Sequence, residues 1–146
     1  MSEVVISYLH YLGFAAMAAA LVLELFLFRT EVPGAVARRL ARVDVGYGAS
    51  ALIVLVSGLM RLLVFGKPVA YYMKNGLFHV KITLFVVAVL LSIYPTINFI
   101  RNRSAPFDGK VAYPGTVGVL MKIQLLILVV IPLLAVMMAR GYGFKG

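Results

Sequence analysis

Residues 116–139 read TVGVLMKIQLLILVVIPLLAVMMA, a stretch whose only charge is Lys122 and which is followed by Arg140. A transmembrane helix needs about 20 mostly apolar residues, because each adds about 1.5 Å across a hydrocarbon core of about 30 Å. Three further stretches meet this requirement, at residues 4–28, 43–65 and 77–100. The connections between them are too short for a soluble domain. The sequence therefore predicts one all-α domain, an integral membrane four-helix up-and-down bundle.

The composition agrees with membrane insertion and excludes several classes of protein. Of the 146 residues, 63% are hydrophobic and 13% are charged, whereas a soluble domain carries about 25% charged residues. The net charge of +9 comes from short clusters between the apolar stretches. We therefore expect the lipid bilayer, and no nucleic acid, as the partner. Because the chain has no cysteine, disulfides, zinc ribbons, thiol nucleophiles and cysteine-ligated iron–sulfur clusters are excluded.

The positive charges predict the orientation of the bundle. Seven lie in the first and third connections: Arg29, Arg38, Arg39, Arg42, Arg101, Arg103 and Lys110. Four lie on the opposite side: Lys67, Lys74, Arg140 and Lys145. Because cytoplasmic loops carry the excess of positive charge, we expect the first and third connections in the cytoplasm. In a bacterial inner membrane, both termini would then be periplasmic.

Ionisable side chains inside the spans are the candidates for function, because a charge at membrane depth is costly. By depth they form two layers. The first layer holds four basic residues: His10, Arg61, His79 and Lys81. The second layer, a buried charge layer, holds three residues: Glu24, Asp44 and Lys122. His10 and Glu24 share one face of the first span, roughly 21 Å apart along its axis.

The first layer has two interpretations. Two histidines at equal depth on parallel helices can ligate the iron of heme b, with Arg61 and Lys81 neutralising the propionates. Alternatively, His79 is solvated near the interface and His10 donates a hydrogen bond to a neighbouring backbone carbonyl. His79 and Lys81 are two residues apart, so they point about 200° from each other on a helix and cannot both line one pocket. We therefore expect His10 to be the better-placed metal ligand.

The second layer also has two interpretations. Glu24 and Asp44 can pair with Lys122 or with Arg29 and Arg42, which would neutralise charges that are expensive near lipid. A proton relay through the carboxylates is the alternative, and we favour the ion pairs.

Two helical stripes are expected to face the interior of the bundle. The stripe of the second span consists of Tyr47, Ser50, Val54, Ser57 and Arg61. The stripe of the third span consists of Lys81, Ala88, Ser92 and Pro95. Small residues in the second span, Gly58 among them, also permit close contact with a partner or with a second copy in a homo-oligomer.

Several motifs, in order along the chain, resemble an uncharacterised family of small bacterial four-helix membrane proteins. They are Leu9-His10-Tyr11-Leu12, Ala37-Arg38-Arg39-Leu40-Ala41-Arg42, Gly76-Leu77-Phe78-His79-Val80-Lys81-Ile82 and Ser92-Ile93-Tyr94-Pro95-Thr96. Together with the four spans, this resemblance covers nearly the whole chain.

A more distant likeness is to the HemJ-type protoporphyrinogen oxidases, which share four spans, a Leu-His in the first span, an arginine pair before the second and a His-Val-Lys opening the third. This resemblance implies heme b with His10 and His79 as ligands, Lys81 beside an anionic group, and electron transfer to quinone or another respiratory redox partner. The chain departs from that family in having no tryptophan and in following Tyr94 with Pro95-Thr96. A copper-resistance membrane family has a comparable first-span histidine, which implies copper handling.

Two hypotheses about function follow, and they leave open whether the protein is an enzyme. The first is a small heme b protein that transfers electrons or oxidises a tetrapyrrole-like substrate in the membrane. The alternative is a non-catalytic accessory subunit, or a carrier of small solutes or copper, whose buried charges are structural.

Overall fold

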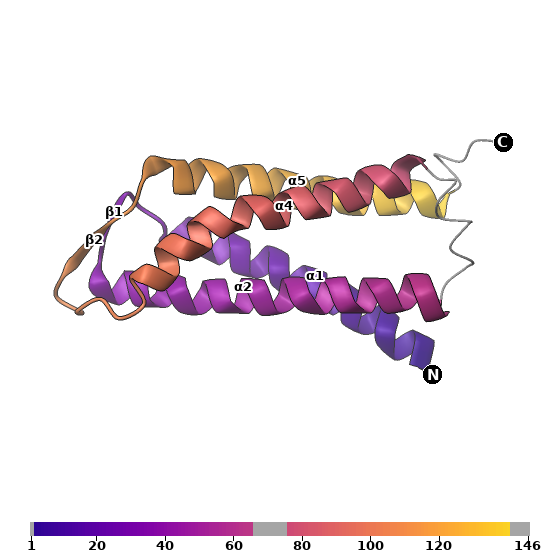
Figure 1. The fold of residues 1–146 in the computed structure, drawn as a ribbon, viewed down its shortest axis with the longest axis horizontal. Helices are drawn as coiled ribbons and strands as arrows, with labels where there is room; N and C mark the ends of the chain where they lie inside the picture. The colour runs from indigo at the N-terminus through magenta and orange to yellow at the C-terminus, as the bar shows by residue number, and fades with distance from the viewer. Residues whose placement is uncertain (1, 66–75, 141–146) are drawn as a thin grey trace.

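The computed structural model describes residues 2–65 and 76–140. Four long helices run through this part of the chain: α1 (Ser2–Leu27), α2 (Gly34–Met60), α4 (Gly76–Arg101) and α5 (Gly115–Ala139). Each is long and apolar enough to cross a membrane, which confirms the predicted all-α four-helix membrane bundle. The helices form two antiparallel pairs, α1 with α2 and α4 with α5 (Figure 1).

The second helix differs from its predicted span at both ends. It begins at Gly34, well before residue 43, because the segment 35–42 is amphipathic: Ala37, Leu40 and Ala41 are buried, whereas Arg39 and Arg42 are exposed. Hydropathy marks only the part of a helix that lies in lipid, whereas an amphipathic extension is held by packing on one face. At its other end α2 continues into a π-helical turn, η1 (Arg61–Phe65).

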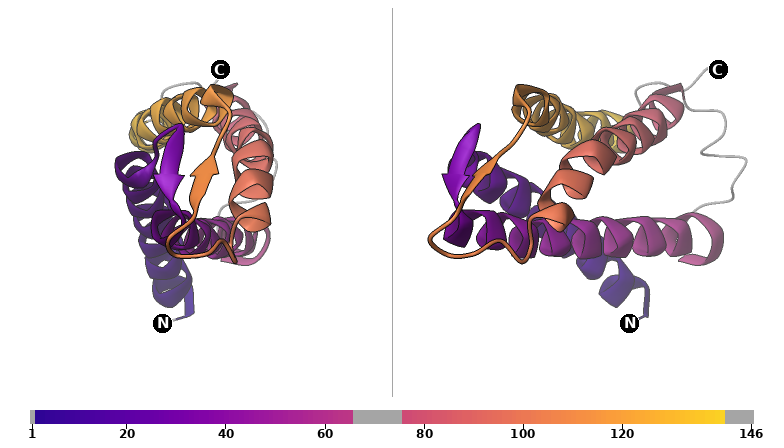
Figure 2. Two further views of the ribbon diagram at one scale, coloured as in Figure 1. Left: turned by 90° about the vertical axis from the view of Figure 1, so that its left-hand side faces the viewer. Right: turned by 60° about the vertical axis from the view of Figure 1, so that its left-hand side comes forward.

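Two short strands connect the helix pairs at the arginine-rich end of the bundle (Figure 2). Strand β1 (Glu31–Pro33) pairs antiparallel with β2 (Lys110–Ala112), with Val32 opposite Val111. Both valines are buried, and their neighbours in each strand are exposed, as the two-residue period of a strand requires. The sequence analysis did not foresee this ribbon, because three-residue strands leave too short a pattern to detect.

Arg38 fixes the connection between α4 and α5 to the start of α2. Its Nε donates a hydrogen bond to the Ala105 carbonyl oxygen at 2.6 Å, and its guanidinium lies 4.3 Å from the centre of the Phe107 ring. The Gly34 amide donates to the Gly109 carbonyl at 2.7 Å, and the Pro106 carbonyl occupies the place of a Gly34 side chain. Only glycine therefore allows this approach of the two segments.

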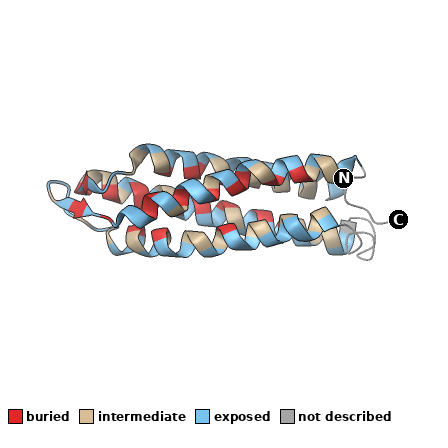
Figure 3. Ribbon diagram, turned by 90° about the horizontal axis from the view of Figure 1, so that it is seen from above, coloured by how far each residue is buried: buried red, intermediate tan, exposed pale blue. Residues whose placement is uncertain are grey.

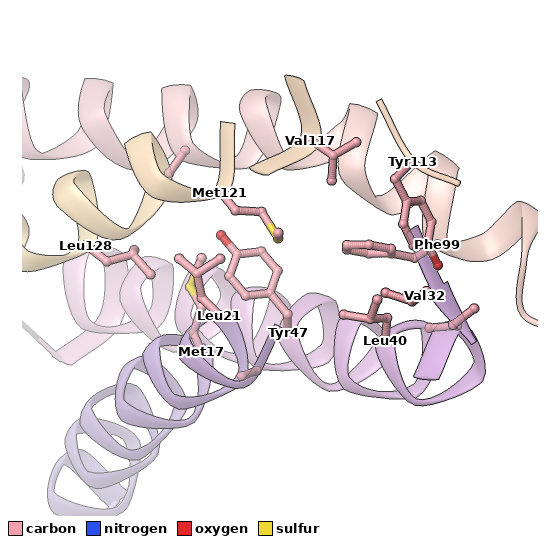
Figure 4. Close-up of a cluster of buried hydrophobic side chains, with 14 of the residues drawn as sticks. Met17, Leu21, Val32, Leu40, Tyr47, Phe99, Tyr113, Val117, Met121 and Leu128 are labelled. Carbon is pink, nitrogen blue, oxygen red and sulfur yellow. The ribbon is translucent and has the colours of Figure 1, made fainter. Parts of the chain in front are cut away.

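The buried residues follow the inner faces of the helices (Figure 3). Figure 4 shows the largest of them meeting between the helix pairs: Met17, Leu21, Leu40, Tyr47, Phe99, Met121 and Leu128. Tyr113, just before α5, stacks edge-on against Phe99 with ring centres 5.5 Å apart. Burial raises the pKa of the Tyr113 phenol to about 12, because its hydroxyl lies away from water.

The two predicted stripes do face the interior. In the α2 stripe, Tyr47, Ser50, Val54 and Ser57 are buried. In the α4 stripe, Ala88 and Pro95 are buried, and Lys81 and Ser92 are partly buried. The outward face of α4 is apolar and exposed, which is the surface that lipid covers in a membrane protein. Its residues include Ile82, Val86, Leu90, Ile93 and Ile97.

Candidate functional site

An apolar cavity of about 180 Å³ lies between the two helix pairs, in the part of the bundle that contains η1. Its apolar lining includes Phe14 from α1 and Phe85 from α4. Three basic side chains also line it: His10 from α1, Arg61 from η1 and Lys81 from α4. The depth argument predicted that these three residues share one layer, and the structure brings them to one cavity.

His10 is held in one orientation by the backbone and side chains of α2. Its Nδ1 lies 3.1 Å from the Val54 carbonyl oxygen and 3.0 Å from the Ser57 hydroxyl. A carbonyl only accepts hydrogen bonds, so Nδ1 carries the proton and Nε2 keeps a free lone pair. The expected donation to a neighbouring backbone carbonyl is thus present, and it is the same bond that orients metal-binding histidines in other proteins.

Gly58 provides the surface on which the His10 ring rests. A Cβ atom at this position would lie 3.1 Å from Cε1 of the ring, closer than an ordinary van der Waals contact. Ser57, one residue earlier, donates its hydroxyl proton to the Ile53 carbonyl at 2.6 Å and so presents an acceptor to Nδ1. The sequence analysis named Gly58 only as a small residue for helix contact and missed this supporting role.

Arg61 and Lys81 make the cavity positively charged. The Arg61 guanidinium lies 5.2 Å from the centre of the Tyr11 ring, and both cations are close enough to His10 to act on it electrostatically. No carboxylate is among the described residues that line the cavity. A low-dielectric cavity with cations and no acid attracts anions.

His79 does not line this cavity. It is exposed on α4, and its ring lies edge-on to Phe78 with centres 5.8 Å apart. The cavity is reached instead by Lys81, in agreement with the argument that neighbours two residues apart point to different sides of a helix. Of the four residues in the first layer, the structure therefore brings three together and leaves His79 apart.

The second layer contains a buried polar cluster to which all four helices contribute. Glu24 from α1 and Asp44 from α2 are 2% and 5% exposed, and their carboxyl groups contact each other. Asp44 also reaches the Thr96 hydroxyl from α4. The Tyr47 hydroxyl of α2 donates to Oε1 of Gln124 in α5 at 2.8 Å. We refer to Glu24, Asp44, Tyr47, Thr96 and Gln124 as the carboxyl cluster.

The expected ion pairs of the second layer are wrong. Lys122 is exposed, because it lies two residues from the inward-facing Gln124 and so points to another side of α5. Arg29 and Arg42 are also exposed, and Arg29 donates to the Phe28 carbonyl. Within residues 2–65 and 76–140, the one ion pair is between Lys110 and Glu31, 3.6 Å apart at the surface.

Sequence reasoning missed that Tyr47, Thr96 and Gln124 join Glu24 and Asp44. Tyr47 was assigned to the inward stripe of the second span, and a polar glutamine in the fourth span was the available signal for Gln124.

The predicted heme and the predicted orientation are not tested by this structure. In the part of the chain that the structure describes, no group of three or more His, Cys, Asp or Glu side chains comes together to hold a metal ion. Three of the lysines used to predict the orientation, Lys67, Lys74 and Lys145, lie outside the described residues.

Comparison with known proteins identifies a family and no function. No curated protein and no solved structure matches the chain, so the likeness to the HemJ-type oxidases and to the copper-resistance family stays a prediction. Residues 2–143 match the family described as predicted membrane protein (DUF2214), which agrees with the resemblance to an uncharacterised membrane family. The chain belongs to the DUF2214 family of membrane proteins.

Proposed function

We propose that this protein binds an anionic, membrane-soluble ligand in the cavity around His10, and that heme b is the ligand to test first. The observation that carries the proposal is the convergence of three basic side chains, from three separate elements, on one apolar cavity without an acid. An apolar lining with a few charged groups is typical of ligand sites. An amphipathic carboxylate matches this site, because its apolar part suits the apolar lining and its negative charge suits the basic side chains.

The donor set suits a heme with a single protein ligand. Nε2 of His10 has the free lone pair that binds iron, and Arg61 and Lys81 provide two cations for the two propionates. Bound heme would supply one-electron chemistry. His79 does not line the cavity, so we propose that, among the described residues, His10 would hold the heme.

The volume of the cavity sets a requirement for this proposal. Pockets for drug-sized ligands measure about 300–1,000 Å³, whereas this cavity measures about 180 Å³. The cavity is therefore smaller than a heme requires, and it would have to widen to hold one. A smaller anionic headgroup fits without such a change.

Absorption spectra of the full-length protein, purified from cells supplied with heme, test the proposal. We expect a Soret band, with α and β bands that sharpen after dithionite reduction. His10→Ala should lose the heme while its membrane insertion is retained, and His79→Ala should keep it. Arg61→Gln and Lys81→Gln should weaken heme retention, with the exposed Lys122→Gln as the matched control. Full heme occupancy in His10→Ala would refute the assignment.

A featureless visible spectrum from heme-replete cells would favour the second candidate function. This is a non-catalytic accessory subunit or a carrier of small solutes, and the burial of Glu24 and Asp44, away from the His10 cavity, is the observation that favours it. For a carrier, Glu24→Gln should reduce transport or assembly, and His10→Ala should leave both unchanged.

We further propose that the chain lies in a bacterial inner membrane with both termini in the periplasm. The excess of Lys and Arg in the first and third connections supports this orientation. The His10 cavity would then open toward the periplasmic half of the bilayer, where quinone or another respiratory partner can exchange electrons with a bound heme. A C-terminal alkaline phosphatase fusion should be active, and a C-terminal green fluorescent protein fusion should be dark. The reverse pattern would invert the orientation.

A further inference from the structure

The carboxyl cluster has no role in the ligand binding proposed above for the His10 cavity. Glu24 lies roughly 21 Å along the α1 axis from His10, so the two sites are separate. Glu24 and Asp44 are almost completely buried, and the described groups that act on them are each other, Tyr47 and Thr96. None of these groups is a cation. Exposed Lys122, Arg29 and Arg42 all point elsewhere.

Two contacting carboxylates without a cation do not both stay ionised at neutral pH. In water the cost of two such charges is modest, but in the interior of a protein it rises several-fold because the dielectric constant falls. A paired site therefore keeps a proton, and the carboxyl that holds it donates a hydrogen bond to the other. Glu24 and Asp44 meet both conditions, because they are buried side chains that act on each other without a cation among the described groups beside them.

A second observation points to a bound molecule at the same place. Oε1 of Glu24 and Nε2 of Gln124 are buried side-chain atoms without a hydrogen-bond partner in the part of the chain that the structure describes. Gln124 is 1% exposed, and its amide is directed into the cluster because Oε1 accepts the proton of the Tyr47 hydroxyl. One free atom is an acceptor and the other is a donor.

Water satisfies both free atoms, whereas a metal ion satisfies only one. A water molecule accepts from the Gln124 amide and donates to the Glu24 carboxyl, and two to four such partners are what a buried water requires. A metal cation would bind the oxygen atoms but would be repelled by the N–H group of Gln124. The chemistry of the cluster therefore favours a proton and a water over a metal.

We propose that Glu24 and Asp44 form a proton-binding site, in which the two carboxyl groups share one exchangeable proton and a bound water links Glu24 to Gln124. Release at alkaline pH breaks the O–H bond of the protonated carboxyl and passes the proton through the bound water to the aqueous phase on the arginine-rich side; uptake reverses this step. The site lies toward the β1–β2 end of the bundle, so it exchanges with the arginine-rich side of the membrane. The titratable groups facing the pair are limited to Tyr47 among the described residues.

Infrared difference spectroscopy of the full-length protein in lipid bilayers tests this site. Between neutral and alkaline pH, where exposed carboxylates stay ionised, we expect the protonated carboxyl C=O band of the pair, which corresponds to about one proton per chain. In D2O the band should shift to lower frequency, because the shared proton exchanges. Glu24→Gln should abolish the band. Glu31→Gln is the matched control, because Glu31 is an exposed carboxylate on β1, and it should leave the band unchanged.

Three outcomes would overturn the proposal. The first is the absence of a protonated carboxyl band in the wild type at neutral pH, and the second is a band that does not shift in D2O; neither depends on a variant that folds. The third is a melting temperature that rises with sodium or calcium in the wild type and not in Glu24→Gln, which would make the cluster a cation site. The heme spectrum is a separate readout, so the failure of one proposal is distinguishable from the failure of the other.

Discussion

Removal of the Tyr47 hydroxyl should destabilise the bundle by leaving a buried amide without its partner. Tyr47 and Gln124 are 3% and 1% exposed, and their hydrogen bond is 2.8 Å long. Interhelical hydrogen bonds in membrane proteins contribute about 0.6 kcal/mol on average and about 1.7 at most. In Tyr47→Phe, the buried Oε1 of Gln124 loses the hydroxyl from which it accepts a hydrogen bond, and a buried acceptor without a partner costs about 1–3 kcal/mol. The folded-to-unfolded ratio should therefore fall roughly tenfold at a loss of about 1.4 kcal/mol.

A double-mutant cycle separates this bond from simple loss of packing. Gln124→Met removes the amide at similar volume, so Tyr47→Phe combined with Gln124→Met should lose less stability than the sum of the two single variants. Reversible unfolding in mixed detergent micelles, followed by circular dichroism, measures each free energy. Tyr94→Phe is the matched control. Because Tyr94 is 43% exposed, this substitution should change the free energy of unfolding by no more than about 0.5 kcal/mol. Additive losses in the cycle would refute the reasoning.

Three further predictions concern the connection, Tyr113 and the His10 seat. Arg38→Ala removes the hydrogen bond and the ring contact that hold the α4–α5 connection, so limited proteolysis of that connection should become several-fold faster. In the control variant Arg39→Ala, which changes an exposed side chain, the connection should be cleaved at the wild-type rate. Burial raises the pKa of Tyr113 from 10.0 to about 12, so the unfolded chain loses this proton at lower pH than the folded chain. The free energy of unfolding should therefore fall as the pH rises from 10.0 towards about 12. Tyr113→Phe should flatten that part of a plot of unfolding free energy against pH. Gly58→Val places side-chain atoms against the His10 ring. The affinity for a ligand that binds at His10, measured by titration, should therefore fall at least tenfold. An unchanged affinity would show that Gly58 does not position the ring.

The four helices were predictable because the membrane imposes a simple rule on sequence. Each span must be long and apolar, since no water is present in the bilayer core to satisfy the backbone. The start of α2 was not predictable by the same rule, because its first turns lie beyond the apolar stretch. The β1–β2 ribbon was not predicted for a different reason. It pairs residues that are far apart in the sequence, and each strand is too short to show an alternation of apolar and polar residues.

The candidate site was predictable only from two quantities, the depth of each residue in the membrane and its angle around the helix axis. Those two quantities place His10, Arg61 and Lys81 together and set His79 apart. The error over Lys122 came from depth used without angle, since Lys122 shares the layer of Glu24 but faces another side of its helix. The predicted ion pairs also rested on the assumption that each buried carboxylate needs a cation beside it. In this structure, Glu24 and Asp44 contact each other instead.

The packing of α4 explains why the cavity lies where it does. From Gly76 to Val87 no residue of this helix is buried, whereas Ala88, Pro95 and Phe99 are buried in its second half. The second half is joined to the ribbon end by the aromatic contact between Phe99 and Tyr113, so that end is the firmly packed one. The first half carries Lys81 and lines the cavity, and its Leu84 and Phe85 pack against the core but are only partly buried. A shift of this half alone would widen the cavity toward the volume of a larger ligand while the packed end stays in place.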